Sequence, residues 1–165
     1  MNIFVLDADP VVCASYHCDK HAVKMCIEYA QLLSTGARQL GLNHDGYKST
    51  HENHPCTRWV SDGVDNWLWT YDLAVALGAE YSRRYGRVHK STEALRLLPY
   101  DLRSIVKRHR PSWFIAVVPE QFMHNDDAVE TYRDYYATDK ASFARWKDGA
   151  VPGWFKERTQ VYKEF

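Results

Sequence analysis

The chain has 165 residues, of which 45% are hydrophobic and 25% are charged. This length and composition indicate one globular domain with its own core and exclude a disordered or fibrous protein. The 21 basic and 21 acidic side chains cancel, so net charge alone indicates no nucleic-acid partner. The sequence shows no signal peptide and no apolar stretch of bilayer length, so we expect a cytoplasmic protein that does not bind a membrane.

The first forty residues predict an extended lead-in and one long helix. The apolar run Asn2–Leu6 is short and suits a strand or an extended segment. Asp9 is a favourable N-cap residue, and Pro10 suits the first position of a helix. The apolar periodicity continues from there, so we expect a single helix over Pro10–Arg38 that stops near Gly41.

The rest of the chain predicts shorter helices joined by polar loops. We expect a loop over residues 43–53, irregular backbone over 111–123 and an aromatic, basic tail from 152. The expected helices begin at Pro55, span 66–85, run from 91 to Pro99 and span 125–146. The predicted fold is mainly α, a single compact helical domain over residues 1–165 with a short extended N-terminal segment.

One face of the long predicted helix concentrates groups that can move protons or bind an anion. At the helical period, this face comprises His17, His21, Lys24, Glu28 and Gln31. The opposite face, expected in the core, comprises Ala22, Val23, Cys26, Ala30 and Leu33. An ordinary solvated helix face is the alternative interpretation of the polar stripe.

A metal site is a second interpretation of these histidines. His17 and His21 lie one turn apart, and His51, His54 and Cys56 could add nitrogen and sulfur ligands if the loop folds over the helix. The glutamate of the zincin motif is missing, and the chain has no glycine-rich phosphate loop. Our main prediction therefore includes no metal and no other cofactor. The cysteines lack CxxC spacing, and we expect them to be reduced.

The pattern Asp19-x-His21, followed seven residues later by Glu28, resembles the first long helix of a known family. That family comprises the pyrimidine-dimer DNA glycosylases of the phage endonuclease V type, including their phage and bacterial branch. The segment Asn53–Pro55 is similar to the family's Gly-His turn, and residues 152–156 are similar to its Pro-x-Trp-Tyr-Lys segment.

The resemblance implies an endonuclease V-like fold and cleavage of the N-glycosidic bond of a damaged or modified pyrimidine in double-stranded DNA. It implies that Glu28 is the central catalytic carboxylate and that His21 lies beside the nucleotide, where it would bind phosphate or protonate the leaving base. We expect a monomer in the cytoplasm of a bacterial or phage-infected cell. The expected DNA-binding residues are Lys24, Gln31, His54, Arg58, Trp59, Trp154 and Lys156.

The N-terminus departs from the family pattern. The family's nucleophile is the α-amino group of a small residue exposed by removal of the initiator Met, and it forms an imine with C1′ of the deoxyribose. Here Asn2 is too large for efficient removal of Met1, and alignment on His21 and Glu28 places Asp7 at the position of the nucleophile. We therefore expect Asp7 beside Glu28 in a two-carboxylate site that releases the base by hydrolysis.

Two other functions remain open at this point. An enzyme of the same fold could edit or build hypermodified DNA bases. Alternatively, the chain could be a non-catalytic DNA- or protein-binding module that has lost the terminal nucleophile.

Overall fold

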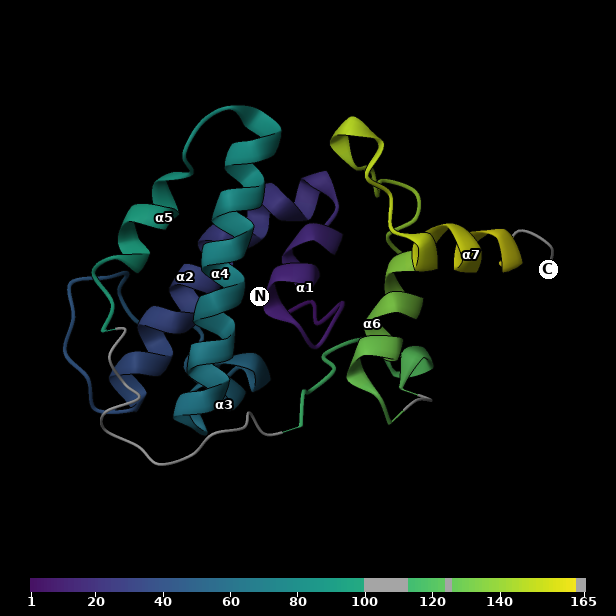
Figure 1. The fold of residues 1–165 in the computed structure, drawn as a ribbon. Coiled ribbons are helices and arrows are strands. Elements are labelled where there is room, and N and C mark those ends of the chain that lie inside the picture. The colour runs from purple at the N-terminus through teal and green to yellow at the C-terminus, as the bar shows by residue number, and fades with distance from the viewer. Residues whose placement is uncertain (100–112, 124–125, 163–165) are drawn as a thin grey trace.

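A computed structural model describes residues 1–99, 113–123 and 126–162, and these residues form helices and no strand (Figure 1). The α-helices are α1 (Pro10–Tyr16), α2 (Asp19–Gln39), α3 (Pro55–Ser61), α4 (Val64–Tyr85), α5 (Lys90–Leu95), α6 (Ala128–Ala137) and α7 (Gly153–Val161). Two 3₁₀ helices, η2 (Glu120–Phe122) and η3 (Lys147–Gly149), lie between them. The predicted mainly α, compact fold is confirmed, and within the described part no helix is long and apolar enough to cross a bilayer.

The single helix predicted over Pro10–Arg38 is wrong, because the chain leaves the helical conformation between α1 and α2. His17 and Cys18 have extended backbones, with ψ of 127° and 161°. The guanidinium of Arg84, on α4, donates hydrogen bonds to the carbonyl oxygens of Ser15 and His17 at 3.1 and 2.8 Å. A tertiary partner therefore satisfies backbone acceptors that would otherwise need the next helical turn.

The main helical layer pairs α2 with α4, and α1, α3 and α5 pack around this pair (Figure 1). Gly36 allows the close approach of α2 to α3, since a Cβ atom there would lie 2.7 Å from Cγ1 of Val60. The indole of Trp67, on α4, is fully buried and donates a hydrogen bond to the carbonyl oxygen of Leu33 at 3.0 Å. Apolar area and close packing thus hold α2, which carries Glu28, against two neighbours.

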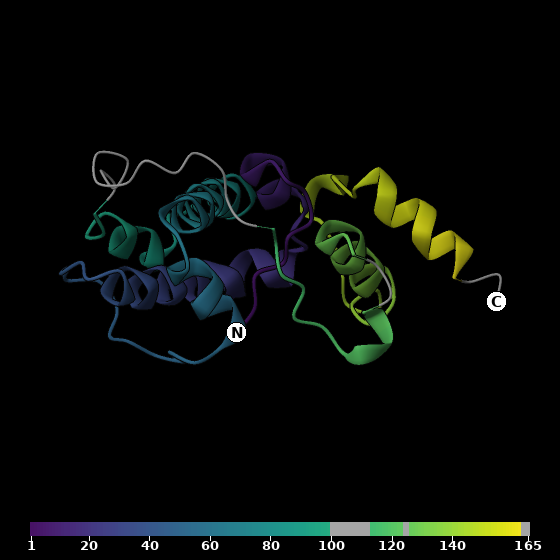
Figure 2. The same cartoon turned by 90° about the horizontal axis from the view of Figure 1, so that it is seen from below.

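The N-terminal segment is an extended lead-in that passes between the α1–α5 layer and α6 (Figure 2). Ile3, Phe4, Val5 and Leu6 are all buried. Phe4 also makes edge contacts with two tyrosines of α6, at ring-centroid distances of 5.7 and 5.4 Å. Burial of this apolar run fixes the chain terminus against the core.

The last third of the chain differs from the predicted boundaries. The helix expected over 125–146 begins after the Asp127 cap but ends at Ala137, and the tail expected from 152 is the helix α7. After α6 the chain turns back to α2, where the N–H of Asp19 donates a hydrogen bond to the carbonyl oxygen of Arg145 at 2.7 Å. In both ribbon views α7 lies at the outer edge, beyond α6 (Figures 1 and 2).

Candidate functional site

The central feature is a pair of groups at the start of the chain and in the middle of α2. The α-amino nitrogen of Met1 lies 3.7 Å from Oε2 of Glu28. The other carboxylate oxygen of Glu28 lies 3.1 Å from Nζ of Lys24, one helical turn earlier. The side chain of Glu28 is 13% exposed, whereas that of Lys24 is 64% exposed. One half-enclosed carboxylate thus faces two amines, one fixed and one at the surface.

The side chain of Asn2 positions the terminal amine. Its Nδ2 donates to the carbonyl oxygen of Val117 at 2.8 Å, and its Oδ1 accepts from the hydroxyl of Tyr132 at 2.6 Å. The thiol of Cys56, whose pKa burial raises to about 11, contacts the same Oδ1 at 3.7 Å. Beside it, the sulfur of Met1 lies 3.9 Å from the hydroxyl of Thr57. Contacts to three separate parts of the chain therefore hold the first two residues.

His54 lies within electrostatic reach of the same pair. It caps α3, since its Nδ1 accepts a hydrogen bond from the N–H of Cys56 at 3.2 Å. Burial, and then the positive terminal amine, lower the pKa of His54, while the charge of Glu28 raises it. This expected DNA-binding residue therefore lies near the amine and carboxylate, with its imidazole favoured in the neutral form.

His21 does not lie in the environment expected from the sequence. Its side chain is buried, stacks on Phe4 at a centroid distance of 4.3 Å and shares a hydrogen bond between Nδ1 and the hydroxyl of Tyr136. Burial, together with the positive charges of His17 and of nearby lysines, lowers its pKa to about 3. A neutral, enclosed imidazole is poorly suited to bind phosphate or to protonate a leaving base, so the expected placement is corrected.

His17 is likewise part of the core and not of the polar face. Its Nδ1 donates to the carbonyl oxygen of Cys13 at 2.8 Å, which leaves Nε2 to accept from the hydroxyl of Tyr29 at 2.6 Å. Burial lowers its pKa to about 4. Val23, expected in the core, is instead 42% exposed. The buried face of α2 therefore includes His21, Met25 and Tyr29 and is rotated from the face that the sequence predicted.

The ligands considered for a metal site have other partners. His51 is exposed and its Nδ1 bonds to the hydroxyl of Thr50 at 2.7 Å, while His17, His21 and His54 are engaged as described. Across residues 1–99, 113–123 and 126–162, no three His, Cys, Asp or Glu side chains are grouped as a metal site. The four cysteines are buried and free, as expected for reduced thiols.

Asp7 is not placed beside Glu28. Its Oδ2 forms an ion pair with Arg133 of α6 at 3.1 Å, and its Oδ1 accepts from the N–H of Asp9 at 3.0 Å. Alignment on His21 and Glu28 placed Asp7 at the position of the family's nucleophile. In the structure the N-terminal segment instead places the α-amino group of Met1 beside Glu28.

The other expected DNA-binding residues are dispersed. Gln31 is half-buried and follows Glu28 by three positions on α2, and Arg58 is exposed on α3 and donates to Oδ1 of Asn53 at 3.2 Å. Trp59 is buried, with its indole N–H bonded to the carbonyl oxygen of Trp113 at 3.0 Å, so it is unavailable as a wedge between bases.

The two expected DNA-binding residues of α7 lie on the outermost helix (Figure 1). Trp154 is half-buried, with the guanidinium of Arg133 5.4 Å from the centre of its ring, and Lys156 is exposed. No hydrogen bond, ion pair or ring contact among the described residues joins either to Met1 or Glu28.

The terminal amine, which the sequence alignment set aside in favour of Asp7, lies beside Glu28, and its anchoring by Asn2 was not predicted. A signal for this placement was present, because the apolar run after Asn2 must be buried and therefore draws the terminus to the core. Comparisons of the chain with protein-family models, with curated proteins and with solved structures found no match.

Proposed function

We propose that this chain is a DNA glycosylase-like enzyme that releases a damaged or modified pyrimidine from duplex DNA, with Glu28 as its central carboxylate. The observation that carries the proposal is the α-amino group of Met1, held 3.7 Å from Glu28. A primary amine beside a carboxylate can form a covalent bond to a sugar carbon and exchange protons during the reaction. The resemblance of the Asp19-x-His21 and Glu28 pattern to the endonuclease V-type glycosylases supports the class of substrate.

The chemistry begins when the amine of Met1 gives up a proton, for which Glu28 is the nearest charged acceptor. The free electron pair attacks C1′ of the deoxyribose, the C1′–N bond to the base breaks, and the base leaves with a proton. Opening of the sugar ring converts the new C–N bond into an imine. The proton that leaves with the base comes from Glu28, which thereby returns to its carboxylate form, and the restored negative charge of Glu28 stabilises the positive charge on the sugar and the imine.

This route replaces the hydrolytic mechanism expected from the sequence, because Asp7 is engaged by Arg133. Of the two amines next to Glu28, the terminal amine is the better placed to attack, because its position is fixed. Lys24 is a flexible, exposed side chain, whereas Met1 follows directly from the anchored Asn2. Fixed geometry lowers the entropic cost of attack.

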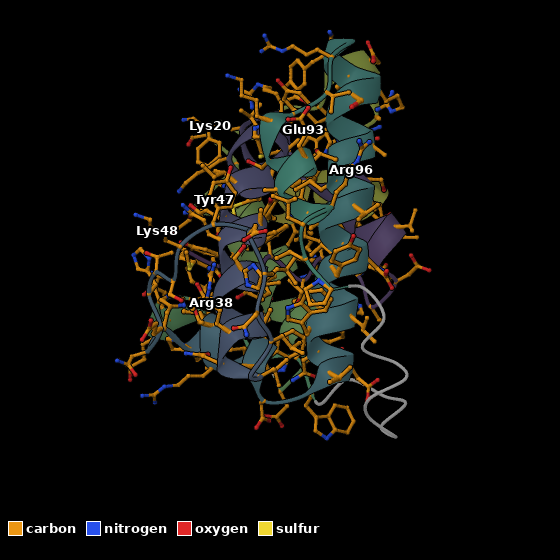
Figure 3. The ribbon with its side chains drawn as sticks, turned by 90° about the vertical axis from the view of Figure 1, so that its left-hand side faces the viewer. Lys20, Arg38, Tyr47, Lys48, Glu93 and Arg96 are labelled. Carbon is orange, nitrogen blue, oxygen red and sulfur yellow. The ribbon has the colours of Figure 1, made fainter. Side chains whose placement is uncertain are left out.

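The test compares the parent protein with Glu28→Gln and with Glu93→Gln, a matched change of an exposed glutamate on α5 (Figure 3). Duplexes that carry different damaged or modified pyrimidines are scored for base release, and borohydride trapping on an abasic duplex is followed by peptide mapping. We expect Glu28→Gln to lower base release by about 100-fold or more while leaving DNA affinity unchanged. Glu93→Gln should behave like the parent, and the trapped adduct should map to residue 1.

Full activity of Glu28→Gln would refute the role of this carboxylate. An adduct on Lys24, or an intact mass showing that residue 1 carries no free amine, would refute the assignment of the nucleophile. Binding of duplex DNA by the parent without release of any base or trapping would instead favour a non-catalytic module.

A further inference from the structure

We propose that one strand of the duplex lies along a basic surface that leads to Glu28, formed by the exposed Lys20 and Lys24 of α2 and by the half-buried Lys140. We call these residues the lysine face. This inference rests on the proposed function, and it names the surface that brings the sugar of the target nucleotide to the reacting pair.

The three lysines converge although they come from distant parts of the chain. Nζ of Lys20 lies 4.5 Å from the centre of the Phe143 ring, and Nζ of Lys140 lies 4.3 Å from the centre of the Tyr135 ring. Phe143 and Lys140 belong to one turn, closed by a hydrogen bond of 3.1 Å from the N–H of Phe143 to the carbonyl oxygen of Lys140. All three lysines also lower the pKa of the buried His21 by their charge, which places them around the same point.

Lys24 pairs with Glu28 at 3.1 Å, whereas among the described residues the charges of Lys20 and Lys140 are uncompensated. Asp19, which precedes Lys20 on α2, is occupied by Arg84 at 2.9 Å and by the N–H of Lys147 at 3.1 Å. Within the described part of the chain, no ion pair joins a carboxylate to Lys20 or Lys140. Their ammonium groups therefore keep N–H donors available for an anion.

The spacing of the lysine face suits an extended polyanion that ends at the reacting pair. Lys20, Lys24 and Glu28 follow one another at intervals of four residues, or about 6 Å along the helix. Val23 and Ile27 lie between them and are 42% and 38% exposed. Alternating cations and apolar side chains fit the phosphates and sugars of a nucleic-acid strand better than an isolated phosphate ion.

The test measures the salt dependence of binding to a duplex that contains a tetrahydrofuran abasic analogue, by fluorescence anisotropy. The variants are Lys20→Gln, Lys140→Gln and the double substitution. Arg96→Gln is the matched control, since Arg96 is exposed but lies at the C-terminal end of α5, as its C-cap, whereas Lys20 belongs to α2 (Figure 3). Thermal melting of each variant checks that its fold is retained.

We expect each lysine substitution to flatten the slope of log affinity against log salt by about 0.9, and the double substitution by about 1.8. Arg96→Gln should leave the slope unchanged. An unchanged slope in the double variant would overturn the lysine face while leaving the proposed function in place. If the lysine substitutions flatten the slope but the parent protein releases no base, the lysine face is supported and the glycosylase activity is refuted.

Two further outcomes would overturn this inference. Absence of duplex binding by the parent protein would refute both the lysine face and the proposed function. Binding to phosphatidylserine vesicles in place of the duplex, lost in the double variant, would identify the lysine face as a membrane-binding surface.

Discussion

Arg84 offers the sharpest test of how the fold positions Glu28. Its guanidinium is completely buried, and Nε and Nη1 lie 2.7 and 2.9 Å from the carboxylates of Glu80 and Asp19. The same group satisfies the carbonyl oxygens of Ser15 and His17 at the junction that precedes α2. Arg84→Met fills much of the volume but leaves two carboxylates and two carbonyl oxygens without this partner.

We expect Arg84→Met to lower the free energy of unfolding by about 3–5 kcal/mol, the typical cost of removing one partner from a buried ion pair. For a chain of this size, this corresponds to a fall in Tm of roughly 10 °C. Urea denaturation followed by circular dichroism provides the measurement. Arg83→Met is the matched control, because the side chain of Arg83 is 50% exposed and its loss should lower the free energy of unfolding much less than the loss of Arg84. Equal effects of the two substitutions would refute the view that Arg84 holds the start of α2.

Two further predictions concern residues whose placement differs from expectation. Asp7→Asn should lower the free energy of unfolding by less than about 1 kcal/mol, because it removes a partly exposed ion pair with Arg133. Unlike Glu28→Gln, it should leave base release intact. An equal loss of base release in both variants would restore the two-carboxylate mechanism. The free energy of unfolding should fall as pH drops below 6.5 toward about 4. Burial lowers the pKa of His17 to about 4 and that of His21 to about 3, so in this range the unfolded chain binds protons that the folded chain does not bind. Urea titrations across this range should show a smaller fall for His21→Gln, and an unchanged fall would contradict the assignment.

Local interactions made several boundaries predictable from the sequence. Asp9 accepts hydrogen bonds from the N–H groups of Val11 and Val12, and Pro10 follows it at the first position of α1. Gly86 ends α4 with a φ of 66°, a left-handed conformation that glycine adopts without strain. Because these devices act within about four residues, the order of residue types is enough to place them.

The predicted grouping of Glu28 with Lys24 follows from the same local rule. Positions four apart on a helix lie on one face, and the two charged groups are 3.1 Å apart. The position of His54 near Glu28 was not predictable from local rules, because His54 caps α3 and comes close to Glu28 through the packing of α3 on α2.

Tertiary structure alone decided which groups from outside α2 lie beside Glu28. The α-amino group of Met1 lies beside Glu28 because the apolar residues after Asn2 are buried between α2 and α6. The side chain of Asn2 is then fixed by Val117 and Tyr132, more than a hundred positions away in the sequence. Such contacts depend on how complete helices pack, so neither helical periodicity nor alignment of a short motif contains the information that places the amine.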